Sequence, residues 1–193
     1  MPLLHDTGRA LALRQRHDGA FVLPGVRFTF GQLRQRSRVQ EHALKRWVNA
    51  GVLEPTKDSR HSGSGNRRIF FDKEVIVAAL LAPFSEAAVP LGRLLRLSRL
   101  FRHALRERRP GLITDGLDRR YRDLGQAMLQ AAQGVGSNFL AVTITSEDNI
   151  HFEAFTSESE LFDAGKFLAA AGGSPSAAIT IIDMTERVHG VLN

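Results

Sequence analysis

Residues 40–50 hold the side chains with the most distinctive chemistry in this chain. In a helix, Leu44, Trp47 and Val48 would share one face. The remaining positions are rich in hydrogen-bonding side chains, namely Gln40, His42, Lys45, Arg46 and Asn49. Gln suits adenine and Lys suits guanine at the base edges exposed in the major groove of DNA. The polar face of this segment is therefore expected to contact base pairs.

Two adjacent arginines, Arg67 and Arg68, offer a second kind of chemistry. They close the segment 56–66, which has almost no apolar side chain and is expected to form a protruding loop. The apolar residues 69–71 follow and should anchor that loop. Guanidinium groups bind phosphate with paired hydrogen bonds and also fit a narrow minor groove. The loop is therefore expected to contact the DNA backbone beside the helix.

The elements that would position these groups can be read from local signals. Thr29 is expected to cap a short helix, and residues 37–39 interrupt its pattern. Gly51 stands where the second helix must end in the left-handed region, and Pro55 bars further helix. Two short helices joined by a tight turn and followed by a basic loop describe a winged helix-turn-helix.

This region resembles the MerR family of bacterial transcription regulators. The resemblance is carried by FTFGQL at 28–33, ALKRWVNAGVLEP at 43–55, RIF at 68–70 and VPL at 89–91. It covers about a third to a half of the chain. It implies that the second helix enters the major groove, that the loop grips the flanking backbone, and that a later helix joins two subunits.

The resemblance also implies roles for individual residues. The groove-facing set would be Gln40, Glu41, His42 and Lys45, and the loop contacts would be Arg67 and Arg68. Arg38 in the turn and Arg46 in the helix complete the candidate DNA-binding residues. The chain departs from the family at Arg46 and Trp47, where the family often has two tyrosines, and in a longer loop over 57–66.

Charge is unevenly distributed along the 193 residues. Residues 1–133 hold 24 of the 26 Lys and Arg and 12 of the 20 Asp and Glu, a formal charge of +12, whereas residues 134–193 carry −6. Surplus arginine can simply be solvated, but beside a helix-turn-helix it favours a polyanionic partner. Because the chain has no cysteine and its seven histidines lack metal-ligand spacing, no metal site is expected. No nucleophile stands in a strained elbow and no acid/base pair stands out, so no enzymatic activity and no cofactor are expected.

Two longer helices are expected after the first unit. Asp72 should cap a helix over 73–82, and Pro83 and Pro90 should bracket a short loop. Leu91 then begins a helix that can run to about residue 109. Its apolar side chains gather on one arc, and the opposite arc gathers Arg96, Arg99, Arg102, Arg106 and Arg109. This arginine arc would support DNA phosphates, meet acidic groups of the carboxy-terminal part, or simply be solvated.

The helix expected over 115–133 carries a heptad pattern. The seam residues are Leu117, Tyr121, Leu124, Met128 and Ala131. One interpretation is a core helix that covers its own subunit. The other, favoured by the family resemblance and by the twofold symmetry of many DNA sites, is a dimerisation seam.

Beyond a hinge at 134–138 the pattern changes to strands at 139–145 and 150–155. Ser157 or Ser159 would cap a helix, a strand over 178–182 would follow, and a short helical tail would end the chain. This describes a small ββαβ unit. A structural or oligomerising role, an effector pocket and a partner-binding role all remain open for it.

The sequence therefore predicts a mainly α fold with a winged helix-turn-helix head, a helical dimerisation segment and a small α+β (ββαβ) carboxy-terminal domain. The expected boundaries are 1–26 for an amino-terminal arm, 27–90 for the head, 91–133 for the helical segment and 134–193 for the last domain. The longest apolar run, 75–84, is too short to cross a bilayer. A cytoplasmic, nucleoid-associated protein without membrane contact is expected.

The expected function is that of a dimeric, sequence-specific DNA-binding transcription regulator of MerR type. Its expected partners are double-stranded DNA and a second copy of the chain, and RNA polymerase at the promoter is a candidate partner. One alternative is a protein-interaction module on a winged-helix scaffold, with the acidic end binding a protein. Another is an excisionase-like architectural DNA-binding protein.

Overall fold

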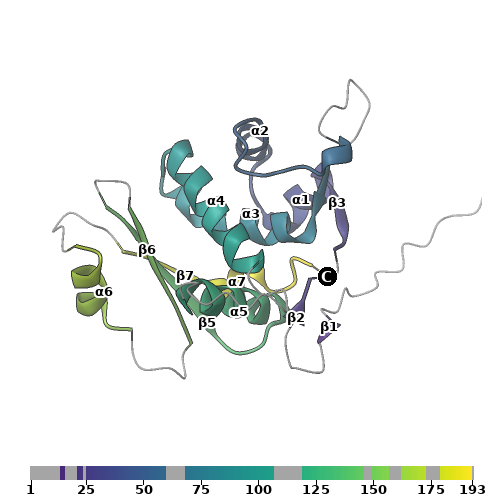
Figure 1. The fold of residues 1–193 in the computed structure, drawn as a ribbon. Helices are drawn as coiled ribbons and strands as arrows, with labels where there is room; N and C mark the ends of the chain where they lie inside the picture. Colours follow the sequence, from purple (N-terminus) through teal and green to yellow (C-terminus); the bar gives the residue numbers. More distant parts are fainter. Residues whose placement is uncertain are drawn as a thin grey trace, which may run out of the picture.

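The computed structural model shows a mainly α-helical protein with small antiparallel sheets (Figure 1). It describes residues 14–15, 21–23, 25–59, 68–106, 119–145, 149–156, 162–172 and 179–192. Within these ranges there are seven α-helices and seven β-strands. Helices α1–α4 group on one side, the sheet of β5–β7 lies on the other, and α5 and α7 lie between them.

The first part of the chain is organised around two small strand pairs. Strands β1 (Arg14–Gln15) and β2 (Phe21–Val22) are antiparallel, as are β3 (Arg27–Thr29) and β4 (Ile69–Phe71). Between β3 and β4 the chain forms α1 (Phe30–Ser37), α2 (Glu41–Asn49) and a 3-10 turn (Lys57–Ser59). Phe28 pairs with Phe70 across the β3–β4 ribbon, and both side chains are buried. Each strand of the ribbon therefore contributes a side chain to the hydrophobic core.

Helix α3 (Asp72–Glu86) differs from the expectation at both ends. Asp72 is its first residue and not its cap, because the carboxylate accepts hydrogen bonds from the amides of Gly25 at 2.7 Å and Val26 at 3.2 Å. Pro83 lies inside the helix and not in a loop. Proline removes one backbone hydrogen bond, but the buried ring of Phe84, 1% exposed, holds the helix in place for a further turn. Helix α4 (Leu91–Arg106) begins where it was expected.

The carboxy-terminal part has the predicted order of elements. Its elements are α5 (Arg119–Gln133), β5 (Asn138–Ile144), β6 (Ile150–Thr156), α6 (Ala164–Ala170), β7 (Ile179–Asp183) and α7 (Met184–Val188). The sheet order is β6-β5-β7, and both pairs are antiparallel. Asp163 caps α6 by accepting from the Lys166 amide at 3.0 Å. The expected caps, Ser157 and Ser159, lie outside the described residues.

The glycine-rich segment after α5 caps that helix. Gly134 has φ +70°, and the next amide, of Val135, donates to the carbonyl of Gln130 at 2.9 Å. A Cβ atom at position 134 would lie only 2.4 Å from Nδ1 of His189. The segment expected to act as a hinge is therefore packed against the chain that follows α7.

Helix α5 does not present the predicted dimerisation seam. Leu124, Met128 and Ala131 are each 0% exposed within a single chain, where α5 packs against α4, α7 and β6. Tyr121 is half-buried, and its ring lies against Phe152 with centroids 5.0 Å apart. Leu117 lies outside the described residues. The heptad spacing correctly predicted that these side chains share one face of the helix, but that face packs against the helix's own subunit.

One hydrophobic cluster joins the amino-terminal helices to the carboxy-terminal sheet. Helix α7 packs on both α3 and α5. The end of the chain also makes polar contacts with the amino-terminal helices. Arg36 Nη1 on α1 donates to the carbonyl of Val191, which follows α7, at 3.3 Å, and Arg187 on α7 pairs with Glu86 on α3 at 3.7 Å. Among the helices that the structure describes, none is long and apolar enough to span a membrane.

Candidate nucleic-acid interface

Two helices joined by a short turn form the first part of the candidate site. Thr29 caps α1 as predicted, in a reciprocal arrangement with Gln32: Thr29 Oγ1 accepts from the Gln32 amide at 3.3 Å, and Gln32 Oε1 accepts from the Thr29 amide at 2.9 Å. Arg38 ends α1 with φ +57°, and its amide donates to the Arg34 carbonyl at 3.1 Å. The three residues 38–40 then redirect the chain into α2.

Helix α2 is fixed at its far end by backbone hydrogen bonds. Gly51 has φ +75°, as its position predicted, and its amide donates to the Val48 carbonyl at 3.2 Å. The Val52 amide donates to the Trp47 carbonyl at 2.8 Å, which completes a Schellman cap. Val52 itself is 0% exposed, so the chain turns straight back into the core. The polar face of α2 is therefore held by a rigid frame.

The polar face of α2 is exposed as the sequence predicted. Its buried side is formed by Leu44, Trp47 and Val48. The candidate residues of this helix and its cap are all exposed, namely Gln40, Glu41, His42, Lys45 and Arg46. Arg38 is also exposed, in the turn that precedes them. The structure thus brings six of the eight predicted DNA-binding residues together on one surface.

Glu41 introduces negative charge into this surface. Lys45 Nζ lies 2.8 Å from one carboxylate oxygen, and Arg34 Nη1 lies 2.6 Å from the other. Hydrogen bonding and charge from Lys45, followed by the same effects from Arg34, hold the pKa of the Glu41 carboxyl below its usual value. The carboxylate therefore orients two cations on neighbouring helices. Arg34 was missed from the sequence, because nothing local indicates that residues on two helices meet across the turn.

Arg68 extends the surface from α2 toward the β3–β4 ribbon. It precedes β4, is half-buried, and its Nη1 donates to Asn49 Oδ1 in the last turn of α2 at 3.3 Å. The ribbon is tied to the preceding chain because the Thr56 amide donates to the Ile69 carbonyl at 2.7 Å. Asn49 was part of the polar face but not of the predicted contact set. Arg67, the other predicted loop contact, lies outside the described residues.

Beneath α2 lies a buried ion pair that the sequence did not indicate. Arg102, 2% exposed, donates to Glu74 through Nε at 2.8 Å and Nη2 at 2.9 Å, and Nη2 also donates to the Val52 carbonyl. Glu74, 0% exposed, further accepts from the Glu54 amide at 3.0 Å. The pair fixes the segment that follows α2 onto α3 and α4. Arg102 therefore does not belong to the exposed arginine arc, where its helical spacing had placed it.

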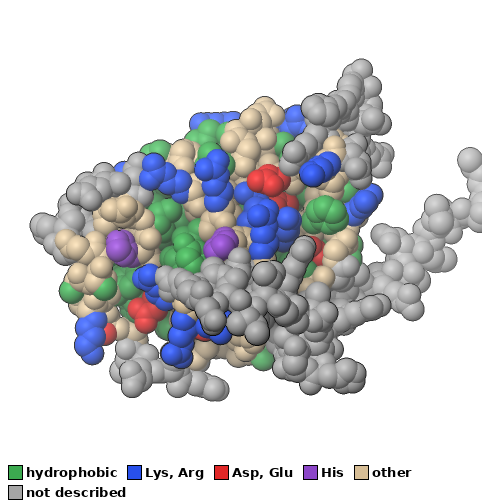
Figure 2. Space-filling model, in the orientation of Figure 1, with side chains coloured by type: hydrophobic (Ala, Val, Ile, Leu, Met, Phe, Trp, Pro, Cys, Tyr) green, Lys and Arg blue, Asp and Glu red, His purple; other side chains and the backbone are tan. Residues whose placement is uncertain are grey.

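Positive charge also covers α4, next to this unit. Figure 2 shows Lys and Arg side chains spread over the face that carries α4, with hydrophobic side chains between them. Arg96, Arg99 and Arg106 of α4 are exposed. Within the described ranges, no cluster of three or more His, Asp or Glu is arranged to hold a metal ion.

No protein-family model matches this chain, and the comparison with curated proteins finds no match. Its function is therefore inferred from the geometry of α1, α2 and the ribbon.

Proposed function

We propose that this protein is a sequence-specific DNA-binding regulator of transcription, similar in type to the MerR family. In this proposal α1 and α2 act as a helix-turn-helix and the β3–β4 ribbon acts as its wing. The observation that carries the proposal is the two-sided character of α2. Its apolar side is packed in the core, while its hydrogen-bonding side is exposed on a helix whose far end is fixed by the Schellman cap.

The exposed face of α2 supports insertion into the major groove. Gln40 and Lys45 have the donors and acceptors that suit adenine and guanine, and Glu41 has acceptors that suit the amino group of cytosine. The first residues of a recognition helix usually contact base edges, and Gln40 and Glu41 stand at that end. The ion pairs of Glu41 with Lys45 and Arg34 would limit the rotamers of all three side chains, which favours discrimination between bases.

The arginines around α2 support contacts with the DNA backbone. Arg38 precedes the helix, Arg46 lies in its last turn, and Arg68 reaches it through Asn49. Guanidinium groups placed around a recognition helix fix its register on the duplex without reading sequence. Such contacts also release counterions, so the affinity should fall as the salt concentration rises.

We further propose that the regulator acts as a homodimer, since paired readers suit twofold DNA sites. The contact between copies would have to use a surface other than Leu124, Met128 and Ala131, which are buried within one chain. Two readers held at a fixed separation could distort a promoter and so alter its use by RNA polymerase.

Duplex binding by matched variants tests the proposal. Arg68→Ala should weaken binding to all sequences alike and reduce the slope of log affinity against log salt by about one. Lys45→Ala should instead change the preference at one base pair, by about 1–3 kcal/mol. Lys166→Ala is the control, because Lys166 lies on α6 and its side chain is 88% exposed. A genome-wide map of bound DNA would supply the sequences to be compared.

The proposal fails if the wild-type protein, folded as judged by circular dichroism, associates with no duplex at low salt. It also fails if Arg68→Ala and Lys166→Ala bind DNA as well as each other and as well as the wild type.

A further inference from the structure

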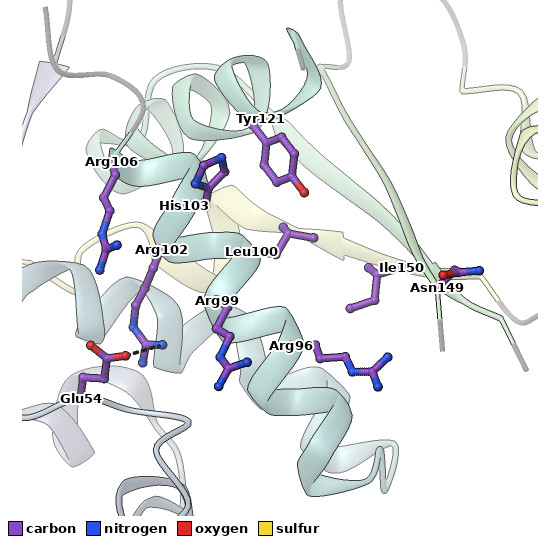
Figure 3. Close-up of a pocket in the computed structure, with 10 residues that line it drawn as sticks. All are labelled: Glu54, Arg96, Arg99, Leu100, Arg102, His103, Arg106, Tyr121, Asn149 and Ile150. Atoms are coloured by element: carbon purple, nitrogen blue, oxygen red, sulfur yellow. Dashed lines mark ion pairs between the residues drawn. The ribbon is translucent and has the colours of Figure 1, made fainter. Parts of the chain in front are cut away.

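A second basic feature, separate from the exposed face of α2, is an open cleft of about 590 Å³ along α4. The turn after α2, the first residues of α5 and the start of β6 complete its walls (Figure 3). The side chains that give it its character are Arg96, Arg99 and Arg106, together with Leu100, Tyr121 and Ile150. Its volume falls within the range of small-molecule sites in proteins.

The cleft carries an excess of positive charge. Four arginines and one glutamate, Glu54, line it, and the buried carboxylate of Glu74 pairs with Arg102. Arg99 and Arg106 are exposed, and within the described part of the chain no carboxylate pairs with either guanidinium. Two guanidinium groups with open donors form a strong site for a phosphate or carboxylate group.

The other side of the cleft is apolar. The guanidinium groups of Arg99, Arg102 and Arg106 lie on the side toward Glu54, whereas Leu100, Tyr121 and Ile150 lie on the opposite side (Figure 3). The Tyr121 ring is held edge-on by His103, with centroids 4.8 Å apart at 90°. Since Phe152 packs against the same ring, the aromatic surface is fixed in orientation.

We propose that this cleft binds a small organic anion that joins a phosphate or carboxylate group to an apolar or aromatic body. Arg99 and Arg106 hold the anionic group, and Leu100, Tyr121 and Ile150 contact the body. The ligand needs both parts of the cleft. The arginine side makes the cleft too polar for a neutral apolar ligand, and the apolar side makes it a poor fit for inorganic phosphate. This site does not depend on DNA binding by α2.

Arg102 connects the cleft to α2. Its side chain lines the cleft, its Nη1 lies 3.5 Å from Glu54 Oε1, and its Nη2 donates to the carbonyl of Val52. The amide of Val52 in turn donates to the carbonyl of Trp47 in α2. An anion held by Arg99 and Arg106, whose guanidinium groups lie on the side of the cleft toward Glu54 (Figure 3), repels the Glu54 carboxylate and so alters the contact that holds the end of α2. Trp47 is the only tryptophan of the chain, so its fluorescence reports on this end of the helix.

Calorimetric titration of the full chain with three probes tests the proposal. Phenyl phosphate carries both parts of the proposed ligand, inorganic phosphate only the charge, and phenol only the ring. Phenyl phosphate is expected to bind saturably and more tightly than inorganic phosphate, and phenol should show no saturable heat. Arg99→Gln and Arg106→Gln should each weaken phenyl phosphate roughly tenfold or more, the loss expected for a hydrogen bond to a charged group.

Arg119→Gln is the matched control, because Arg119 is an 87% exposed arginine on α5 that does not line the cleft. Its affinity for phenyl phosphate should equal that of the wild type. Trp47 fluorescence should change with the same midpoint as the heat in the wild type and in Arg119→Gln. Circular dichroism and thermal unfolding of each variant confirm that a loss of binding is not a loss of fold.

Absence of saturable phenyl phosphate binding, or equal affinity in all four proteins, would overturn the proposal. The cleft would instead be a nucleic-acid contact if phenyl phosphate did not bind while Arg99→Gln and Arg106→Gln weakened binding to duplex DNA. Binding without any Trp47 response would overturn the connection to α2. Because the titration contains no DNA, its outcome is independent of the proposed regulatory function.

Discussion

Replacing Arg102 with methionine removes the positive half of the buried Arg102–Glu74 pair while keeping most of the side-chain volume. Among the described residues, the carboxylate of Glu74, 0% exposed, would then keep only the amide of Glu54 as a partner. Removing one member of a buried pair typically costs about 3–5 kcal/mol, because the other charge remains without compensation. The Val52 carbonyl also loses its donor. A loss of this size is a large part of the roughly 5–15 kcal/mol that stabilises a typical domain.

The double variant Arg102→Met, Glu74→Met separates the charge from the packing. It has no buried charge, so its cost is that of the two backbone groups left without partners, the Glu54 amide and the Val52 carbonyl. Each such group costs about 1–3 kcal/mol when it remains buried. Two single losses of about 3–5 kcal/mol each would sum to about 6–10 kcal/mol, against about 2–6 kcal/mol for the two backbone groups. The double variant should therefore be more stable than the sum of the two single losses predicts, by about 4 kcal/mol.

Urea unfolding followed by Trp47 fluorescence and by circular dichroism measures these free energies, and coincident transitions would justify a two-state treatment. The reasoning is refuted if Arg102→Met costs less than about 1 kcal/mol, well below the range for a broken buried pair. Strictly additive single losses would also refute it, since they would mean that the two side chains do not interact energetically.

Substitutions at three other positions test backbone and burial effects by the same unfolding assay. Burial raises the pKa of Asp72 above its ordinary value of 3.8, against hydrogen bonds from the amides of Lys73, Gly25 and Val26. Its contribution to stability is therefore full below pH 3.8 and is lost as the pH rises through the raised pKa, and Asp72→Asn should remove that dependence. Arg38→Gly should stabilise the fold by up to about 1 kcal/mol by relieving the left-handed φ, whereas Arg38→Ala should not. Gly51→Ala should destabilise it by about 1–2 kcal/mol, purely through backbone strain, because the added methyl group meets open space.

Local signals in the sequence predicted local structure well. The cap at Thr29 and the left-handed residue at Gly51 each depend on a few neighbouring residues, and both are confirmed. The order of strands and helices after residue 138 also agrees with the periodicity of the sequence. The exposed face of α2 could be predicted because helical spacing fixes which side chains share a side.

Contacts between distant segments could not be predicted in the same way. Asp72 was assigned to its own helix, but its carboxylate binds amides 46 and 47 residues earlier in the chain. Arg102 shares helical spacing with exposed arginines, and its burial follows only from the position of Glu74 on another helix. The heptad pattern of α5 identified a face correctly, yet spacing alone does not say which surface covers that face.

In the candidate site, too, local features could be predicted and contacts between helices could not. The exposure of Gln40, Lys45 and Arg46 followed from the pattern of a single helix. The pairing of Glu41 with Arg34 required the angle between two helices, which no local pattern encodes. The function of this surface stays a proposal until duplex binding is measured.

The contact between Arg36 and Val191 spans 155 residues, and it has a consequence for how the chain folds. Closing so long a loop carries a large entropic cost, so contacts of this kind form late. Until α7 docks, the side of α3 that it covers stays open to water. A partly folded chain would therefore expose the apolar surface of α3 that α7 covers. Aggregation during refolding should decrease when the protein concentration is lowered.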